Sequence, residues 1–268
     1  MANRPEAAKG VRNGVGTEET SFEIVTLKQR PELGEQIDLL HQETWDRFLD
    51  GAPWRYWDSL FDTFADFQIL LCEPNDVVIG FGHTVPFVWD GTTEDLPPML
   101  DEIIERALDD HRHARKPTAL SALAAVVAPK YQKRGLSLDI IRAMGSLAAE
   151  HNLPSLVAPV RPTLKHRYPL TPMERYVQWK RADGSPFDPW IRVHWRLGAE
   201  QLCVAPKTAI STGTVAEWEE WTGMSFPESG TYVVPGALQP VEIDREQNMG
   251  RYEDPGLWML HRVTESAT

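Results

Sequence analysis

The sequence predicts a mixed α/β domain whose central sheet is mostly antiparallel and is flanked by helices. The apolar run Ala119–Ala128 predicts a buried strand, and a short loop leads from it into helical periodicity over residues 137–150. Ser155–Val160 supplies the next strand, which completes a β-α-β unit. Upstream, the strand-like runs Phe67–Glu73 and Val77–Trp89 are separated by Pro-Asn-Asp, which predicts an antiparallel hairpin.

The other elements follow from the same patterns in chain order. Ser21–Lys28 alternates as a short strand, and the apolar spacing over Pro31–Asp50 predicts a helix that ends near Gly51. Further predicted helices are Trp54–Phe64, Leu96–Arg115, Thr171–Lys180, Trp190–Ala199 and Thr214–Thr222. Further predicted strands are Leu202–Ala205, Gly230–Pro235 and Leu257–His261.

The chain is expected to divide into three parts. Residues 1–20 lack periodicity and predict a disordered leader. Residues 21–205 form the main domain. Residues 206–268 form a β-rich C-terminal extension that packs on the same domain, because no linker separates the two.

Composition excludes several classes of protein. A formal net charge of −12 argues against a nucleic-acid partner, which needs a broad basic surface. No apolar run is long enough to span a membrane, and the first residues lack a signal-peptide core, so we expect a cytoplasmic protein without a membrane partner. Cys72 and Cys203 lie in apolar runs and are expected to pack in the core. The sequence predicts no metal site, and it leaves a homodimer open.

The loop before the helix at 137–150 is the best candidate for a binding site. A helix N-terminus presents unpaired N–H groups and the positive end of the helix dipole, which together favour an anion. Gly135 lets the backbone approach a phosphate closely. Lys130, Lys133 and Arg134 add positive charge in an acidic chain. This combination indicates a small polyanionic ligand.

The same loop resembles the signature of the GNAT superfamily of acyl-CoA-dependent N-acyltransferases, which reads Gln/Arg-x-x-Gly-x-Gly/Ala. Gln132 and Gly135 match it, and Ser137 replaces the final small residue. The resemblance covers about 21–205 and implies acetyl-CoA or another acyl-CoA as co-substrate, with the pantetheine arm between strands 119–128 and 155–160. The residues it implies for coenzyme binding are Val126, Val127, Gln132, Lys133, Arg134, Gly135, Leu136 and Ser137. It also makes Leu96–Arg115 an inserted helix.

The resemblance also suggests catalytic candidates. His194 lies four residues before Gly198, where the family often has a tyrosine that protonates the leaving thiolate, and an imidazole can donate a proton near neutral pH. A backbone N–H near Val127 is implied to polarise the thioester. The strand Ala119–Ala128 contains no carboxylate to act as base, so His83 becomes the base candidate and His166 a weaker one. A remote base, a water, or no base for a weakly basic nucleophile stay open.

The acceptor pocket is expected to involve the first two helices. Trp45, Trp54 and Trp57 are interspersed with charged residues there, which suits a small polar-aromatic or amphipathic metabolite, although core packing alone also explains such rings.

The leading hypothesis is therefore an N-acyltransferase that moves an acyl group, most simply acetyl, from coenzyme A to a small-molecule amine or related nitrogen nucleophile by direct attack. One alternative is a protein of the same fold that acts on a carrier-protein thioester or decarboxylates a thioester. Another is a non-catalytic CoA-binding sensor or scaffold. The sequence alone does not identify the acceptor, the acyl chain or the base.

Overall fold

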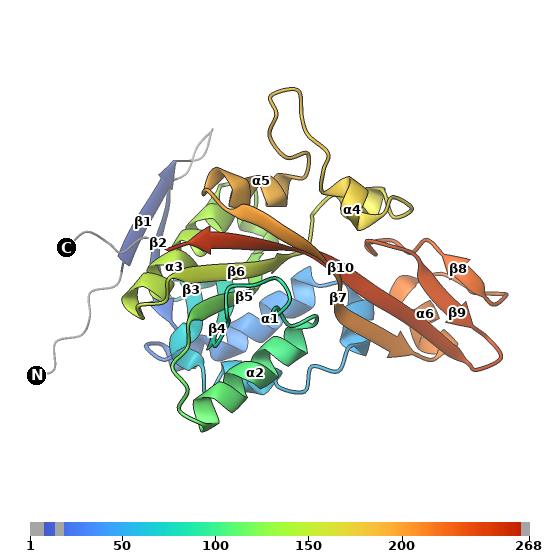
Figure 1. The fold of residues 1–268 in the computed structure, drawn as a ribbon, viewed down its shortest axis with the longest axis horizontal. Coiled ribbons are helices and arrows are strands. Elements are labelled where there is room, and N and C mark those ends of the chain that lie inside the picture. Colours follow the sequence, from blue (N-terminus) through green and yellow to red (C-terminus); the bar gives the residue numbers. More distant parts are fainter. Residues whose placement is uncertain (1–7, 14–18, 264–268) are drawn as a thin grey trace, which may run out of the picture.

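The computed structural model describes the backbone of residues 8–13 and 19–263 and the side chains of residues 21–263. A ten-stranded sheet runs through the molecule, with helices on both faces (Figure 1). The strands are β1 (Ala8–Asn13), β2 (Glu19–Thr26), β3 (Gln68–Cys72), β4 (Val78–Phe87), β5 (Ala119–Val127), β6 (Ser155–Val160), β7 (Glu200–Gly213), β8 (Gly230–Tyr232), β9 (Val241–Asp244) and β10 (Met249–Arg262). The α-helices are α1 (Gly34–Thr44), α2 (Leu100–Arg112), α3 (Leu136–Glu150), α4 (Met173–Tyr176), α5 (Pro189–Arg196) and α6 (Val215–Thr222).

The predicted fold class is confirmed. The strand order is β1-β2-β3-β4-β5-β6-β10-β9-β8, and β7 pairs with β10. Every pairing is antiparallel except the one between β5 and β6, which is parallel because α3 provides the crossover between them. The hairpin of β3 and β4 and the β5-α3-β6 unit lie where the sequence predicts them.

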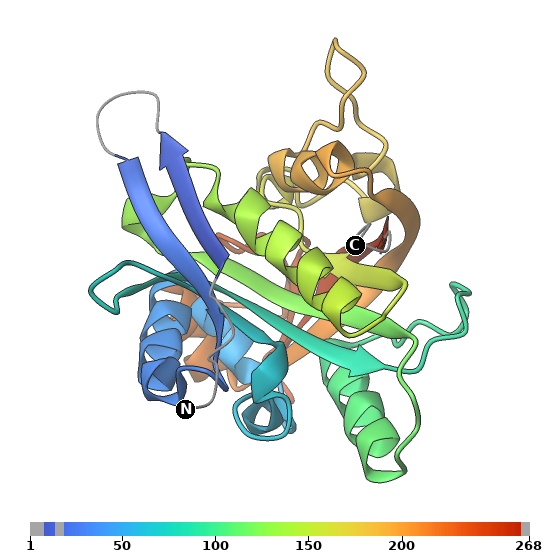
Figure 2. The same cartoon turned by 90° about the vertical axis from the view of Figure 1, so that its left-hand side faces the viewer.

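The two faces of the sheet carry different helices. Figure 2 shows α3 lying diagonally across one face, with α5 beside it. Gly82 on β4 permits this packing, since a Cβ there would lie 2.6 Å from Met144 Cε and 2.8 Å from Ile140 Cγ2 of α3. The next residue, His83, points to the opposite face and contacts His41 of α1. The sheet is therefore covered on both sides.

The predicted helices over 31–50 and 54–64 differ from the structure. The first ends at Thr44, because Trp45 is extended, and the chain continues into a 3₁₀ turn at Arg47–Gly51. The second is reduced to a 3₁₀ turn at Trp57–Leu60. Pro53 keeps the preceding Ala52 extended. Packing among the rings of Trp45, Trp54 and Trp57 stabilises the segment from Trp45 to Leu60, which does not form a regular helix.

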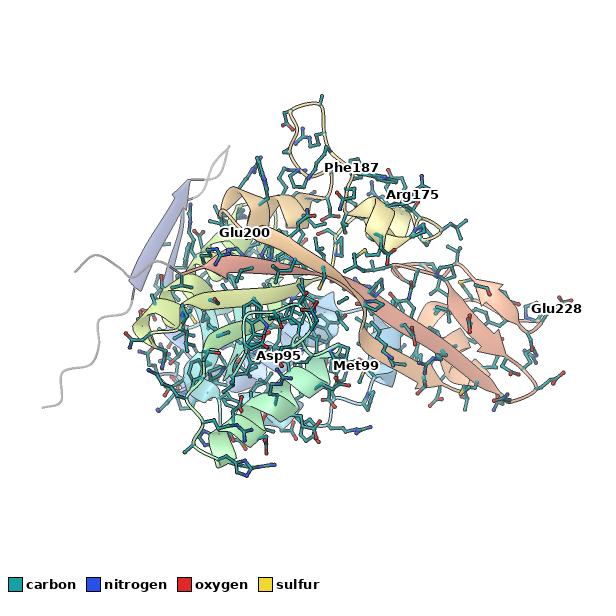
Figure 3. All side chains as sticks on the ribbon, viewed as in Figure 1. Asp95, Met99, Arg175, Phe187, Glu200 and Glu228 are labelled. Carbon is teal, nitrogen blue, oxygen red and sulfur yellow. The ribbon has the colours of Figure 1, made fainter. Side chains whose placement is uncertain are left out.

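The C-terminal residues complete the main sheet. β10 is inserted between β6 and β7, and residues 214–248 form a small lobe of α6, β8 and β9 at one end (Figure 1). Figure 3 labels Glu228 at the outer end of this lobe. Its core combines Phe48 from the 3₁₀ turn with Trp218 and Tyr252. The expected boundary at residues 205–206 falls inside β7, and the division into parts stays a prediction.

The N-terminal leader differs in part from the expectation. Residues 8–13 form β1, which pairs antiparallel with β2, whereas residues 1–7 and 14–18 lie outside the described residues. Over the described ranges, no helix is both long and apolar enough to cross a membrane. Cys72 is fully buried in the core, where burial raises the pKa of its thiol to about 12. Cys203 is partly buried.

Candidate functional site

The main cavity lies where the two parallel strands separate. β5 and β6 pair through Leu120–Leu156 and Ser121–Val157, near the start of each strand. A cavity of about 620 Å³ opens between their carboxyl-terminal halves. Ligands of open α/β sheets bind at the carboxyl edge of parallel strands, and this slot is the place expected for a pantetheine arm.

Helix α3 begins at the edge of this cavity. Gly135 is its N-cap with φ of 85°, a conformation that glycine adopts without strain. No side chain of the described residues caps the helix, so its first N–H groups face the loop. A Cβ on Gly135 would meet no atom within 4 Å, which shows that the positive φ, not crowding by the protein, requires glycine. The geometry is that of an anion site.

The residues predicted to bind coenzyme are brought together here, with one exception. Those that line the cavity are Val126, Val127, Gln132, Lys133, Gly135, Leu136 and Ser137. Gln132 donates from Nε2 to the carbonyl of Val127 at 3.2 Å, which ties the loop to the end of β5. Arg134 is not a lining residue, and its guanidinium lies 5.2 Å from the centroid of the Tyr131 ring. Their roles toward a coenzyme stay predictions.

Strand β5 is irregular beside the cavity. His83 lies opposite Ala124 and Thr84 opposite Ala122, so Leu123 is an extra residue in a β-bulge. A bulge takes backbone groups out of the ladder and can turn an N–H toward a ligand carbonyl. The predicted polarising N–H near Val127 stays a prediction, and the observed irregularity lies earlier in the strand, at Leu123.

His194 is buried and lines the cavity. Asp188 caps α5 by accepting from the backbone N–H groups of Trp190 and Ile191, and this fixes the helix that carries His194. The Nδ1 atom of His194 lies 2.8 Å from Nε2 of His261 on β10. Its Nε2 is buried and has no hydrogen-bond partner among the described residues.

The electrostatics of this pair change its expected role. Burial, and then the neighbouring His261, lowers the pKa of His194 to about 3. Burial lowers the pKa of His261 to about 4. Both imidazoles are therefore neutral at pH 7. His194 can donate a hydrogen bond from Nε2 as a neutral imidazole, and its predicted role as general acid stays a prediction.

His83, the predicted base, lies outside the cavity lining. It is fully buried, with Nδ1 2.8 Å from Oε1 of Gln68 and Nε2 3.1 Å from Nε2 of His41. Burial, and then His41, holds the pKa of His83 well below its ordinary value. The structure thus does not bring His83 to a substrate in this cavity, because alternation along β4 turns it toward α1.

The predicted aromatic residues form one cluster. The ring centroids of Trp45, Trp54 and Trp57 lie 5.3–5.6 Å apart. Trp45 and Trp54 line the cavity, whereas Trp57 lies behind them against His83. Trp54 is held by a hydrogen bond from Nε1 to the carbonyl of Leu49 at 3.1 Å. Two of the three rings can therefore contact an acceptor.

A charged cluster lies in the same cavity. Arg161 follows β6, and its Nε lies 3.0 Å from both carboxylate oxygens of Asp254. Its second contact is with Asp46, at 3.4 Å from a terminal guanidinium nitrogen, and the same nitrogen donates to the carbonyl of Gly236 at 3.1 Å. The hydroxyl of Tyr252 also donates to Asp254. Two carboxylates thus share one guanidinium.

A second cavity adjoins the first at this cluster. Its volume is about 570 Å³, and its lining residues are Asp46, Arg161, His166, Val233, Val234, Pro235 and Gly236. Asp46 and Arg161 belong to both cavities. His166, the weaker base candidate, reaches only the second one.

Comparison with known proteins shows what the chain is similar to. No family model matches the chain. An arginine N-acetyltransferase, avaD, from Aspergillus versicolor is 29% identical over 275 residues, covering 90% of this chain and 94% of that protein. The loading GNATL domain of CurA from Lyngbya majuscula superposes with a TM-score of 0.60 at 14% identity, covering 90% of this chain and 98% of that domain. The GNAT-like decarboxylase GphF, solved with isobutyryl-CoA, has a TM-score of 0.53 at 14% identity, covering 90% and 99%.

The chain has the fold of GNAT proteins and is similar over 90% of its length to an N-acetyltransferase. The protein is an acyltransferase that moves an acyl group from coenzyme A to an amine. The two solved structures share its fold, but at 14% identity they carry no statement about its reaction.

Four residues of the site were missed from the sequence. Asp46 and Arg161 are 115 positions apart, and Arg161 and Asp254 are 93 apart. Arg161 carried a usable signal, because it follows directly on the parallel strand β6, whose carboxyl end faces the cavity. His261, the partner of His194, carried none.

Proposed function

We propose that this protein transfers the acetyl group of acetyl-CoA to the α-amine of arginine or a closely similar cationic amino acid. The proposal rests on the extent of the main cavity, which reaches from the N-terminus of α3 to the cluster of Asp46, Arg161 and Asp254. A polyanionic donor fits the first end, and a zwitterionic acceptor fits the second. The 29% identity to an arginine N-acetyltransferase over 90% of the chain supports the same acceptor.

The charges at the acceptor end match such a molecule. The carboxylates offer partners for an ammonium or guanidinium group, and Arg161 offers one for an α-carboxylate. Trp45 and Trp54 supply apolar walls for the aliphatic part of the side chain. Donor and acceptor then meet in the slot between β5 and β6, where proximity provides much of the acceleration.

His194 assists the leaving group in this proposal. Its unpartnered Nε2 is a buried donor in the wall of the slot, and a hydrogen bond from it stabilises charge that develops on the thioester sulfur. His261 fixes the ring by donating from Nε2 to Nδ1 of His194, which leaves the His194 proton on Nε2.

The test is acetylation of a panel of amines. Purified protein is incubated with acetyl-CoA and L-arginine, agmatine, L-lysine or L-glutamate, and the release of CoA thiol and the mass of the product are measured. We expect α-N-acetylation of L-arginine, weaker turnover of L-lysine and agmatine, and none of L-glutamate. Binding of acetyl-CoA without turnover of any amine contradicts the proposal and favours the sensor alternative.

Replacement of His194 by leucine is expected to lower kcat about 30-fold, since a hydrogen bond to a charged group contributes about 2 kcal/mol. The Kd of acetyl-CoA should change little. Steady-state kinetics and calorimetric titration measure the two effects. An unchanged kcat removes His194 from the mechanism, whereas loss of acetyl-CoA binding assigns it a structural role.

Location in the cytoplasm and assembly as a homodimer stay predictions. Size-exclusion chromatography with light scattering tests the second.

A further inference from the structure

The carboxylate of Asp46 lies where the two cavities join. Asp46 lines both of them and is the N-cap of the 3₁₀ turn at Arg47–Gly51. An aspartate at an N-cap ordinarily accepts hydrogen bonds from its own turn. Here its side chain makes no capping hydrogen bond. The carboxylate is therefore left available to the cavities.

The neighbouring charges leave Asp46 incompletely paired. Arg161 is held by Asp254 through two contacts of 3.0 Å, but it reaches Asp46 through one contact of 3.4 Å. The Asp254 side chain is only 5% exposed, whereas that of Asp46 is 37% exposed. Asp254 is thus the firm partner of the guanidinium. Asp46 keeps the capacity to bind a second cation.

Gly236 allows this position of the carboxylate. It has φ of 84°, and a Cβ on it would lie 2.5 Å from Oδ1 of Asp46. Its carbonyl accepts from Arg161, so one backbone residue fixes both members of the contact. The groups that face Asp46 are Arg161, Asp254 and His166. Burial raises the pKa of Asp46, Arg161 and His166 oppose this shift, and Asp254 adds to it.

We propose that Asp46 binds the ammonium group of the acceptor at the junction of the two cavities and accepts its proton. This inference rests on the proposed function. It supplies the base that strand β5 lacks, from a segment between α1 and β3. The second cavity then gives the proton a path to solvent past His166.

The proton transfer balances as follows. The ammonium group gives one proton to the Asp46 carboxylate, and the freed nitrogen lone pair forms a bond to the thioester carbon. The C–S bond breaks, and its electron pair leaves with sulfur. The second proton on nitrogen passes to that thiolate, giving CoA thiol and the N-acetyl product. Asp46 then loses its proton to solvent.

The test compares Asp46→Asn with Asp50→Asn, an exposed acid of the same 3₁₀ turn. We measure kcat and KM for L-arginine between pH 6.5 and 9.5, and the Kd of acetyl-CoA by calorimetry. For Asp46→Asn we expect kcat to fall about 100-fold at pH 7, with unchanged acetyl-CoA binding. The deficit should shrink as the pH rises past the pKa of the amine, because the acceptor then arrives neutral. Asp50→Asn should match wild type.

The outcomes separate this inference from the proposed function. If Asp46→Asn turns over L-arginine at the wild-type kcat, the role of Asp46 is overturned and the proposed function is left intact. If the variant raises KM but keeps the wild-type kcat, the proton transfer is overturned. No turnover of any amine by wild type overturns both. If Asp46→Asn no longer binds acetyl-CoA, a second variant is used: Gly236→Ala displaces the Asp46 carboxylate without removing it. Its control is Gly184→Ala, which also lies at positive φ but has open space around the added Cβ. A kcat for Gly236→Ala equal to that of Gly184→Ala contradicts the inference.

Discussion

Replacement of Gly135 by glutamate is expected to raise the Kd of acetyl-CoA about 1000-fold. The residue is the N-cap of α3, and its Cβ would point into open space, so the new carboxylate would lie where a pyrophosphate binds. Two like unit charges about 4 Å apart at a protein surface repel by about 4 kcal/mol, which corresponds to that factor. Calorimetric titration of wild type and variant with acetyl-CoA measures it.

Strain at positive φ must be separated from this charge effect. Gly223 is a matched control, because it has φ of 66°, meets no atom within 4 Å of an added Cβ, and terminates α6 in the distant small lobe. Gly223→Glu should lose about 1 kcal/mol of stability and bind acetyl-CoA normally. Equal affinity of wild type and Gly135→Glu would show that coenzyme does not bind at α3.

The end of the cavity proposed to bind coenzyme could be predicted from the sequence, because its residues are close together in the chain. The loop 132–137, the helix that follows it and the strand before it are contiguous, so their periodicity and the position of Gly135 already define the geometry. His194, which was chosen by its distance from Gly198, lines the cavity, and its catalytic role stays a prediction. Burial, and then the neighbouring His261, lowers the pKa of His194 to about 3, which favours a neutral hydrogen-bond donor over a proton donor, and no sequence pattern records this contact.

The acceptor end could not be predicted because it is assembled from distant segments. Asp46, Arg161 and Asp254 meet only when β10 enters the sheet beside β6. The C-terminal residues were expected to form an extension, and a single sequence gives no sign that their last strand pairs within the main sheet. The predicted helix at 54–64 had suitable spacing, but spacing does not record ring packing against Trp45.

Acidification is expected to destabilise the folded protein at a pH well above the ordinary pKa values of carboxylates. His83, His194 and His261 are buried and His41 is half-buried, and the pKa values of all four lie far below the value of about 6.5 for an unfolded chain. A depressed folded pKa means that stability is complete above pH 6.5 and is lost as the pH falls toward 4, since only the unfolded chain binds protons there. Each group costs about 1.4 kcal/mol per pH unit, and the four together about 8 kcal/mol by pH 5. Domains are stable by about 5–15 kcal/mol, so this loss approaches the whole.

Urea unfolding followed by circular dichroism between pH 5 and 7.5 measures this loss. The double variant His194→Leu, His261→Leu removes both partners of one hydrogen bond, so it leaves neither unsatisfied. It should lose only about 4 kcal/mol over the same range, because two of the four imidazoles, His41 and His83, remain. His113→Leu is the control, since this side chain is 62% exposed. A wild-type stability that is flat from pH 7.5 to 5 would mean that these imidazoles take up protons within the fold. His194 could then serve as the proton donor to sulfur, so the same titration decides between the two roles for that residue.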